Sequence, residues 1–284
     1  MAQPVAIDLF AGAGGFGLGF KMAGFSVPVS LEIDTWACDT LRYNHPNMVV
    51  IQEDIRNFNS SSSVTNIYSS KPDIIIGGPP CQGFSIAGPA VKDPKDPRNS
   101  LFQNFAQWIT FLEPKAFVME NVKGLLTRRS AEGEKVIDII KKTFTELGYF
   151  VEVWLLNAAE YGIPQIRERV FIVGNKIGKE LKPPRKTHSL ELVNKKTIQL
   201  SVFDTVNLLP ATTLWDAISD LPLLEAREGL EEQTFTAEPQ NEYQHWIRNY
   251  SKTLYNHVAM EHSERLVERF KHIKWGESSS DVPE

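Results

Sequence analysis

The first half of the chain alternates short apolar runs with stretches of helical spacing, and this alternation constrains the fold more than any other feature. Val5–Phe10 and Val27–Glu32 are short apolar runs, whereas Phe16–Ala23 and Trp36–Asn44 space their apolar residues like helices. Nearly continuous apolar strands separated by helices are typical of a parallel sheet covered on both faces, so we expect an α/β fold. The other expected elements are strands 49–51, 74–76 and 116–119, a serine-rich loop at 59–63, helices 101–112 and 131–147, and a closing strand pair, 149–156 and 169–173.

A glycine-rich loop follows the first expected strand. Gly12, Gly14 and Gly17 match the pattern G-x-G-x-x-G between a strand and a helix, which is the context in which this pattern binds nucleotide-like ligands. Glu32, at the end of the next expected strand, can accept hydrogen bonds from ribose hydroxyls. Asp8 disfavours a pyrophosphate, because its charge repels phosphate, and favours a ligand with a cationic amino acid end. NAD, FAD and S-adenosylmethionine all use this geometry, and a plain glycine-rich turn is the remaining alternative.

A second candidate site follows the expected strand 74–76, in the sequence Gly-Gly-Pro-Pro-Cys-Gln-Gly-Phe-Ser. It carries Cys81 just past the C-terminal end of a strand, where open α/β sheets bind ligands. Pro, Gln and Gly neighbours make a poor core, so a nucleophile is the better interpretation of Cys81, whereas Cys38 is expected to be buried filler. A free thiol has a pKa of about 8.5, so Cys81 needs help from its surroundings to react near neutral pH.

Composition excludes several classes of protein. With 42% hydrophobic and 23% charged residues, the chain resembles a soluble globular protein, and no run approaches the ~20 apolar residues that cross a bilayer. Two cysteines are too few for a disulfide framework or a structural zinc site, and the N-terminus lacks a secretion signal, so we expect a cytoplasmic location and no metal. The net charge of −5 gives no global sign of nucleic-acid binding, yet residues 165–187 carry seven cations against two acids.

Four motifs in order resemble those of the cytosine-5 DNA methyltransferase family, and their spacing resembles it too. They are Asp8–Phe16, Gly78–Ser85, Glu120-Asn121-Val122 and Gln165-x-Arg167-x-Arg169. The resemblance is close from Val5 to Gly174 and looser over 214–222 and 256–276. It implies a Rossmann-like S-adenosylmethionine-dependent methyltransferase fold, with a mostly parallel sheet and a closing antiparallel strand. It also implies a prokaryotic DNA (cytosine-5-)-methyltransferase of a restriction-modification system, associated with the nucleoid through its double-stranded DNA substrate.

The resemblance assigns catalytic roles to four residues. Cys81 would attack C6 of a flipped-out cytosine and so make C5 nucleophilic, because unactivated C5 is a poor nucleophile. Glu120, at the tip of the expected strand 116–119, would hydrogen-bond the ring at N3 and the exocyclic amine. Arg167 and Arg169 would contact O2 of the base and support the site.

The resemblance also assigns a cofactor, S-adenosyl-L-methionine, and the residues that bind it. Phe10 and Ile55 would flank the adenine, Asp54 would accept a hydrogen bond from its amino group, and Glu32 would bind the ribose. The implied cofactor residues are Asp8, Phe10, Gly12, Gly14, Glu32, Asp54, Ile55, Pro79 and Leu101.

Two later motifs of the family, of the types Arg-x-x-Thr-x-Arg-Glu and Gly-Asn-x-Val-Pro-Pro, are not found in the sequence. We therefore expect a catalytic and cofactor-binding domain over residues 1–177, and a linker with the start of a smaller, incomplete recognition region over 178–284. A split enzyme, in which a second polypeptide supplies the recognition region and the final motifs, is the favoured explanation. The alternatives are a truncated, catalytically silent DNA-binding or regulatory relative and an incomplete chain. An RNA substrate and an NAD-dependent oxidoreductase also remain open.

Overall fold

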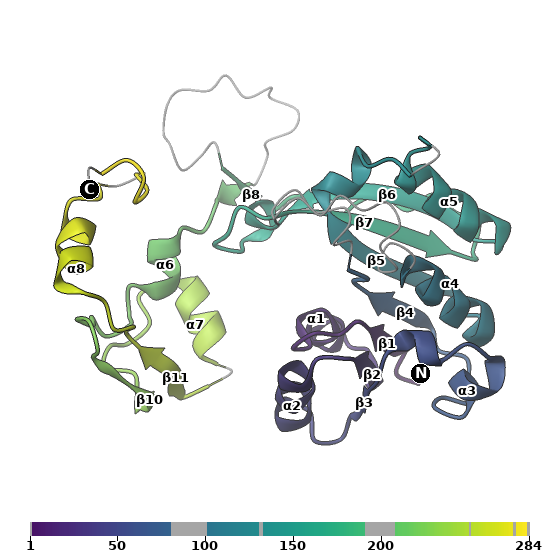
Figure 1. Cartoon of the computed structure of the whole chain (residues 1–284), viewed down its shortest axis with the longest axis horizontal. Coiled ribbons are helices and arrows are strands. Elements are labelled where there is room, and N and C mark those ends of the chain that lie inside the picture. The colour runs from purple at the N-terminus through teal and green to yellow at the C-terminus, as the bar shows by residue number, and fades with distance from the viewer. Residues whose placement is uncertain are drawn as a thin grey trace. The chain divides into compact units, whose positions relative to one another are not determined.

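The computed structural model describes residues 2–80, 101–130, 133–190, 208–249, 251–274 and 277–282. The chain divides into two compact units, Met1–Asn157 with Arg167–Arg185, and Ala158–Ile166 with Lys186–Glu284. Most of their helices and strands are labelled in Figure 1. The functional boundary expected between residues 177 and 178 stays a prediction, because compactness does not reveal what either unit does. None of the helices in these described ranges is long and apolar enough to cross a membrane.

A seven-stranded sheet forms the centre of the first unit, in the order β3-β2-β1-β4-β5-β7-β6 (Figure 1). The strands from β3 to β5 run parallel to one another, and β7 is antiparallel to both β5 and β6. The expected mostly parallel sheet with an antiparallel strand near one edge is therefore confirmed. The strands are β1 (Val5–Leu9), β2 (Ser26–Glu32), β3 (Val49–Gln52), β4 (Ile74–Gly77), β5 (Ala116–Val122), β6 (Phe150–Asn157) and β7 (Glu168–Asn175). The helices are α1 (Gly15–Met22), α2 (Thr35–Asn44), α3 (Ser61–Thr65), α4 (Leu101–Leu112) and α5 (Val136–Glu146), with short 3-10 helices η1 (Ile55–Asn57) and η4 (Lys123–Leu126).

Side chains of the central strands pack into two apolar clusters. Ile7 and Leu9 of β1 belong to the larger cluster, which includes buried residues of α4 and α5, whereas Ala6 belongs to the smaller one. Phe16 and Phe20 of α1 pack against the smaller cluster. Successive side chains of a strand point to opposite faces, so this division shows that helices cover both faces of the sheet. It explains why the central strands are nearly continuous apolar runs in the sequence.

Two helices of the first unit differ from the sequence-based expectation. The serine-rich segment 59–63, expected to be a loop, contains the start of α3, because the Ser60 side chain accepts from a backbone N–H three residues later at 3.2 Å. Such a capping contact begins a helix. The helix α5 begins at Val136 rather than near residue 131, because Gly133 has a φ of +86°, which a right-handed helix does not accommodate.

The second unit has little apolar core. Ala159, Ala211 and Val282 are its buried hydrophobic residues among those that the structure describes. Its strands form a parallel pair, β8 with β9, and an antiparallel pair, β10 with β11. The elements are η5 (Ala158–Tyr161), β8 (His188–Ser189), β9 (Leu209–Pro210), α6 (Leu214–Ile218), β10 (Gly229–Thr234), α7 (Glu242–Arg248), β11 (Thr253–Val258) and α8 (Glu264–Lys271).

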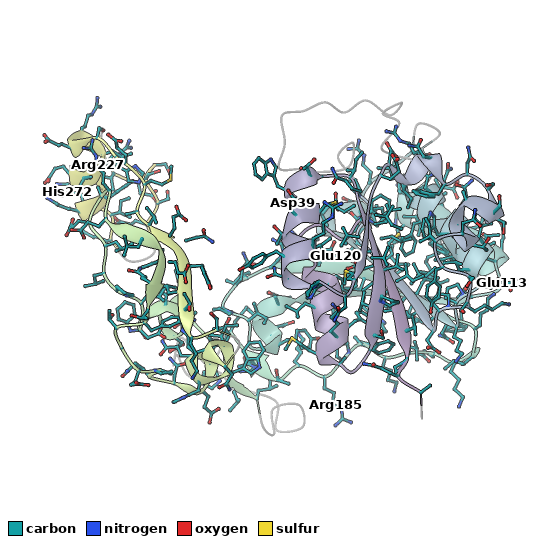
Figure 2. The ribbon with its side chains drawn as sticks, turned by 90° about the horizontal axis from the view of Figure 1, so that it is seen from below. Asp39, Glu113, Glu120, Arg185, Arg227 and His272 are labelled. Atoms are coloured by element: carbon teal, nitrogen blue, oxygen red, sulfur yellow. The ribbon has the colours of Figure 1, made fainter. Side chains whose placement is uncertain are left out.

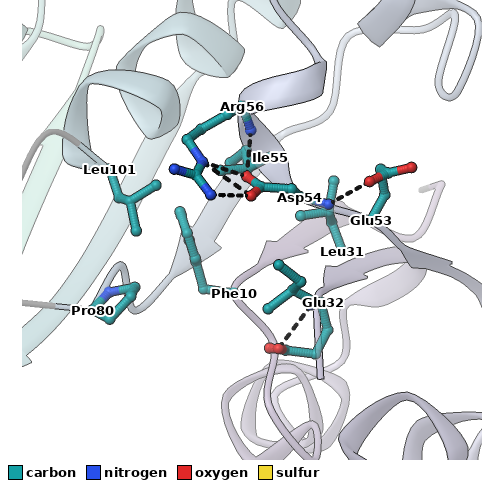
Figure 3. Close-up of a pocket in the computed structure, with 10 residues that line it drawn as sticks. Phe10, Leu31, Glu32, Glu53, Asp54, Ile55, Arg56, Pro80 and Leu101 are labelled. Carbon is teal, nitrogen blue, oxygen red and sulfur yellow. Dashed lines mark hydrogen bonds and ion pairs between the residues drawn. The ribbon is translucent and has the colours of Figure 1, made fainter. Parts of the chain in front are cut away.

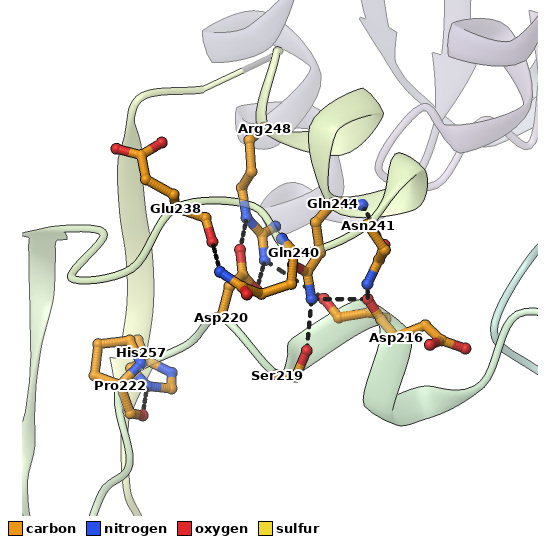
Figure 4. A network of polar contacts seen from close by, with 11 residues as sticks. Asp216, Ser219, Asp220, Pro222, Glu238, Gln240, Asn241, Gln244, Arg248 and His257 are labelled. Atoms are coloured by element: carbon orange, nitrogen blue, oxygen red, sulfur yellow. Dashed lines mark hydrogen bonds and ion pairs between the residues drawn. The ribbon is translucent and has the colours of Figure 1, made fainter.

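Polar contacts join the region of α6 to α7 in this second unit (Figure 4). The Nε2 atom of Gln244 donates to the carbonyl oxygen of Asp216 and to Oγ of Ser219, both at 2.8 Å. Arg248 donates to both carboxylate oxygens of Asp220, at 2.9 and 2.7 Å, and Asp220 is 1% exposed. Satisfied polar groups therefore fill the place that apolar side chains fill in the first unit.

Candidate active site

The glycine-rich loop between β1 and α1 has backbone conformations that favour glycine. Gly12 and Gly14 have φ values of +54° and +89°, and a Cβ atom on Gly14 would lie 2.6 Å from Cδ2 of Leu41. Phe10 also has a positive φ, +57°, which is uncommon for a residue other than glycine. The N–H of Gly12 donates to Oε2 of Glu32 at 2.7 Å, so the loop is held against the end of β2.

Glu32 has a carboxylate that backbone donors hold in place. Its other oxygen, Oε1, accepts from the N–H groups of Ile33 and Asp34 at 2.8 and 2.9 Å. With the Gly12 N–H, three donors fix the carboxylate at the C-terminal end of β2. A carboxylate that is oriented in this way can still accept hydrogen bonds from a ligand, because it has about four lone-pair sites.

A cavity of about 180 Å³ opens beside Glu32 (Figure 3). It lies where β1, β2, β3 and β4 end and α4 begins, which is the ligand-binding edge of an open α/β sheet. Its lining is Phe10, Leu31, Glu32, Ile33, Glu53, Asp54, Ile55, Arg56, Pro80 and Leu101.

Five of the nine cofactor residues predicted from the sequence meet in this cavity. They are Phe10, Glu32, Asp54, Ile55 and Leu101. The prediction named Pro79, but the next residue, Pro80, lines the cavity, and Asp8, Gly12 and Gly14 lie outside the lining. The sequence reasoning missed Leu31, Ile33, Glu53, Arg56 and Pro80. Each of these is directly adjacent in sequence to a predicted residue, and that adjacency was the available signal.

Asp54 is the N-cap residue of η1 and forms an ion pair with Arg56, which also lines the cavity. Its carboxylate accepts from the backbone N–H of Arg56 at 2.9 Å and from the guanidinium of the same residue. The hydrogen bonds from Arg56 hold the pKa of Asp54 below its usual value. Glu53 accepts from the Asp54 N–H and from Nδ2 of Asn57, both at 2.8 Å, so the loop after β3 is ordered by its own side chains.

Asp8 lies on β1, and only 1% of it is exposed. Its Oδ2 accepts from the N–H of Gly17 at 3.0 Å, while Oδ1 has no hydrogen-bond partner among the described residues. Burial, with a smaller contribution from the charge of Glu32, raises the pKa of Asp8 to about 7. A Cβ atom on Gly17 would lie 2.7 Å from Oδ2, so the glycine allows Asp8 to join β1 to the first turn of α1. The Asp8 carboxylate therefore contacts α1 and does not line the cavity.

The candidate catalytic carboxylate, Glu120, lies inside β5. The prediction put it at the tip of a strand ending at Met119, but β5 continues to Val122 because β7 pairs with it as far as Arg169. Oε1 of Glu120 lies 2.8 Å from Nε of Arg169, and the two side chains are 30% and 24% exposed. Burial raises the pKa of Glu120, although the nearby charges of Arg169 and Arg167 oppose the rise. Figure 2 labels Glu120 and also Glu113, which is more than half exposed.

The two halves of the site meet at the Pro79-Pro80 pair. Buried Asn121, the residue after Glu120, donates from Nδ2 to the carbonyl oxygen of Pro79 at 3.1 Å. Pro80 lines the cavity. Cys81, the next residue in the sequence, lies outside the described residues.

Arg167 precedes β7 and has an exposed side chain. Its backbone N–H donates to Oδ1 of Asn157 at 3.1 Å, which joins the chain before β7 to the end of β6. Its charge still acts on Glu120, so both predicted arginines act electrostatically on the predicted carboxylate.

A family model described as C-5 cytosine-specific DNA methylase matches residues 5–281. The chain belongs to this family. As a member of the C-5 cytosine-specific DNA methylases, it has the Rossmann-like fold of S-adenosylmethionine-dependent methyltransferases, as the sequence predicted. The matched residues extend through the second unit, so both units belong to the region that defines the family.

Curated relatives of this C-5 cytosine-specific DNA methylase are type II methyltransferases. M.DdeI of Desulfomicrobium norvegicum is 45% identical over 278 residues, which cover 98% of this chain and 63% of that protein. M1.HphI of Haemophilus parahaemolyticus is 37% identical, with the same coverage of 98% and 63%. The chain thus spans somewhat less than two thirds of these relatives. M.AquIA of Picosynechococcus is 41% identical over 76% of this chain and 88% of its own length.

One solved structure resembles nearly the whole chain, and another resembles about two thirds of it. A protein from E. coli described as a DNA modification methyltransferase encoded within a prophage is 27% identical, with a TM-score of 0.71, over 97% of this chain and 77% of that one. The DNMT2 mutant from Spodoptera frugiperda is 21% identical with a TM-score of 0.50 over 69% of this chain, which is a likeness of fold alone.

Proposed function

We propose that this family member is the catalytic part of a DNA (cytosine-5-)-methyltransferase, which transfers a methyl group from S-adenosyl-L-methionine to C5 of a flipped-out cytosine. One observation carries the proposal. The cavity and Glu120 adjoin the same two prolines, because Pro80 lines the cavity and Pro79 bonds to the residue after Glu120. Cys81 follows them directly in the sequence. This sequence order supports the proposal that Cys81 acts as a nucleophile between the cofactor cavity and Glu120.

The cavity fits the adenosine part of S-adenosylmethionine. Its volume of about 180 Å³ is below the ~300–1,000 Å³ of pockets that hold a whole drug-sized ligand, so it suits one ring system. Phe10, Ile55 and Leu101 offer apolar surface to a purine, and the carboxylates of Asp54 and Glu32 can accept from an amine and from ribose hydroxyls. S-Adenosylmethionine, when bound, supplies an electrophilic methyl group.

The side chains of this chain would supply the rest of the chemistry. The thiolate of Cys81 forms a bond to C6 of cytosine, and the electron pair of the C5–C6 double bond becomes available at C5 for methylation. Loss of the C5 proton to a water molecule then restores that double bond as the S–C6 bond breaks and the thiolate leaves. Glu120, whose pKa is raised by burial, would form a hydrogen bond to N3 that strengthens while the ring is electron-rich. Arg169 holds this carboxyl in position.

We propose that target recognition uses a second polypeptide in addition to the residues of this chain. One comparison supports a split arrangement. M.AquIA is matched over 88% of its length, so a curated relative of comparable extent exists.

Covalent trapping tests the proposed chemistry. The chain is incubated with S-adenosylmethionine and DNA containing 5-fluorocytosine, with and without the product of the adjacent gene, and resolved on a denaturing gel. Fluorine at C5 cannot leave as a cation, so a covalent protein–DNA adduct should accumulate. Cys81→Ser should abolish the adduct and Cys38→Ser, at the buried second cysteine, should preserve it. An adduct that survives Cys81→Ser contradicts the proposal, and cofactor binding without any adduct would favour the silent DNA-binding relative.

A further inference from the structure

Arg56 lines the cavity, yet the proposed chemistry gives it no role. It lies on η1, two residues after Asp54, and both side chains border the cavity (Figure 3). Its Nε donates to both oxygens of Asp54, at 2.9 and 3.0 Å, and its Nη2 donates to Oδ2. The Arg56 backbone N–H donates to Oδ1 at 2.9 Å.

These contacts limit the number of hydrogen bonds that the Asp54 carboxylate can still accept from a ligand. An ionised carboxylate accepts at about four lone-pair sites and has no hydrogen to donate. Three N–H groups of Arg56 point at Asp54, namely the backbone N–H, the Nη2–H and the Nε–H, and the two oxygens share the Nε–H. About one acceptor site therefore remains for a ligand. That site can take one N–H of an amine and repels a carbonyl oxygen.

The ion pair also fixes the charge and the orientation of Asp54. A planar guanidinium holds a carboxylate in a two-point geometry that lysine cannot reproduce. Glu53 independently orders the same loop by accepting from the Asp54 N–H and from Asn57. Loss of the Arg56 side chain should therefore leave the loop in place and leave the Asp54 carboxylate held only by the backbone N–H of residue 56.

We infer that Arg56 is a positioning residue that sets the base selectivity of the cavity, by holding Asp54 as a pure acceptor that takes a purine with an exocyclic 6-amino group and rejects a 6-oxo purine. The inference rests on the proposed function, because it assumes that the cavity binds the adenine of the methyl donor. It goes beyond that function by assigning the discrimination to Arg56, a residue that acts through another.

Binding of two matched ligands tests the inference without any need for methyl transfer. S-Adenosylhomocysteine and its 6-oxo counterpart, S-inosylhomocysteine, are titrated by isothermal calorimetry into the wild-type chain, Arg56→Gln and Arg56→Lys. The wild type should prefer the adenine ligand by about tenfold or more, because the 6-oxo group leaves the acceptor unpaired. Arg56→Gln should weaken the binding of S-adenosylhomocysteine by about fivefold. It should change the affinity for S-inosylhomocysteine by less than about twofold. The selectivity of Arg56→Lys should lie between those of the wild type and Arg56→Gln.

Arg42→Gln is the matched control, because Arg42 also pairs with an aspartate, Asp39, at 3.0 Å but does not line the cavity. It should leave both affinities unchanged. Equal weakening of both ligands by Arg56→Gln would overturn the inference, since a residue that only supports the fold does not change a selectivity ratio. Equal affinities of the wild type for the two ligands would overturn the inference too. Failure of the wild type to bind either ligand would instead refute the proposed cofactor, and the inference with it.

Discussion

The two units of this chain are stabilised by different kinds of contact. In the first, Phe105, Phe117 and Phe144 are fully buried, and their rings contact one another with centroids 4.2 to 6.3 Å apart. In the second, the described residues bury few and mostly small apolar side chains, and Asp220 and Gln244 are as deeply buried as any of them. Apolar burial depends on the total surface removed from water, whereas a buried polar network depends on every partner.

This difference predicts what a mutation in each unit will change. The cavity and the Glu120–Arg169 pair lie wholly within the first unit, on strand ends that its apolar core positions. Damage to that core should reduce both stability and ligand binding. Damage to the polar network of the second unit should reduce the stability of that unit and leave cofactor binding intact. Hydrogen exchange resolved by peptide separates the two units, since one unfolding curve need not describe both.

The largest effect is expected for Phe117→Ala in the first unit. Phe117 has no exposed surface and contacts the rings of Phe144 and Tyr149. Removal of a buried ring should cost about 3–5 kcal/mol, through lost burial and the cavity left behind. Hydrogen exchange should become faster across the sheet of the first unit, and S-adenosylhomocysteine should bind more weakly. An equal loss of protection in the second unit would break the distinction between the units.

A smaller effect, which depends on pH, is expected for Asp8→Asn. The folded pKa of Asp8 is about 7 against an ordinary value of 3.8, so the folded state binds more protons than the unfolded state between these values. Stability should therefore fall as the pH rises from about 4 to about 7 and stay low above it, by at most about 4 kcal/mol. Asn cannot ionise and can still accept from Gly17, so the variant should lose this pH dependence and be more stable than the wild type at pH 8.

Asp73→Asn provides a control of opposite sign. Asp73 accepts from Lys115 and from the Val5 N–H, and these contacts lower its pKa. Its contribution to stability is present above the ordinary carboxyl pKa and is lost as the pH falls through the lowered value. This variant should therefore be less stable than the wild type at neutral pH. If Asp8→Asn instead keeps the wild-type pH dependence, Asp8 does not carry the raised pKa.

Asp8 and Glu120 show what the sequence could and could not predict. The places of Asp8 and Glu32 around a glycine-rich loop are a local pattern that predicts a ligand site, whereas Phe10, Asp54 and Leu101 are predicted from the resemblance to the family. That the Asp8 carboxyl contacts Gly17 could not be predicted, since it depends on how α1 packs on β1. The inclusion of Glu120 inside β5 likewise depends on pairing with β7, a strand distant in sequence.

The second unit was the part least accessible to sequence reasoning. Its polar network joins Asp216, Ser219 and Asp220 to Gln244 and Arg248 across more than twenty residues. No hydrophobic periodicity marks such contacts, because each depends on one donor meeting one acceptor. The sequence accordingly predicted only a linker and the start of a smaller, incomplete recognition region over residues 178–284.

Asp220→Asn should have an intermediate effect, confined to the second unit. It removes the charge that Arg248 contacts with two hydrogen bonds, while Asp220 is 1% exposed. A fully buried pair broken in this way costs about 3–5 kcal/mol, and the partial exposure of Arg248 reduces the expected loss to about 2 kcal/mol. Exchange in α6 and α7 should accelerate while S-adenosylhomocysteine affinity stays unchanged. Glu232→Gln, at an exposed carboxylate of β10, should change neither.

The smallest effects are expected at exposed ion pairs, and they should be alike in the two units. Glu113 pairs with Lys71 in the first unit, and Glu261 pairs with Arg227 in the second, with all four side chains more than half exposed. Water and salt screen such pairs, and ordering two long side chains offsets their attraction. Glu113→Gln and Glu261→Gln should each shift the unfolding temperature by less than about 2 °C, whether salt is low or high. A large effect of Glu261→Gln alone would mean that the second unit depends on its surface charges as well as its buried polar network. Equal, small effects would confine the contrast between the units to their interiors, where one unit buries aromatic rings and the other buries an aspartate and a glutamine.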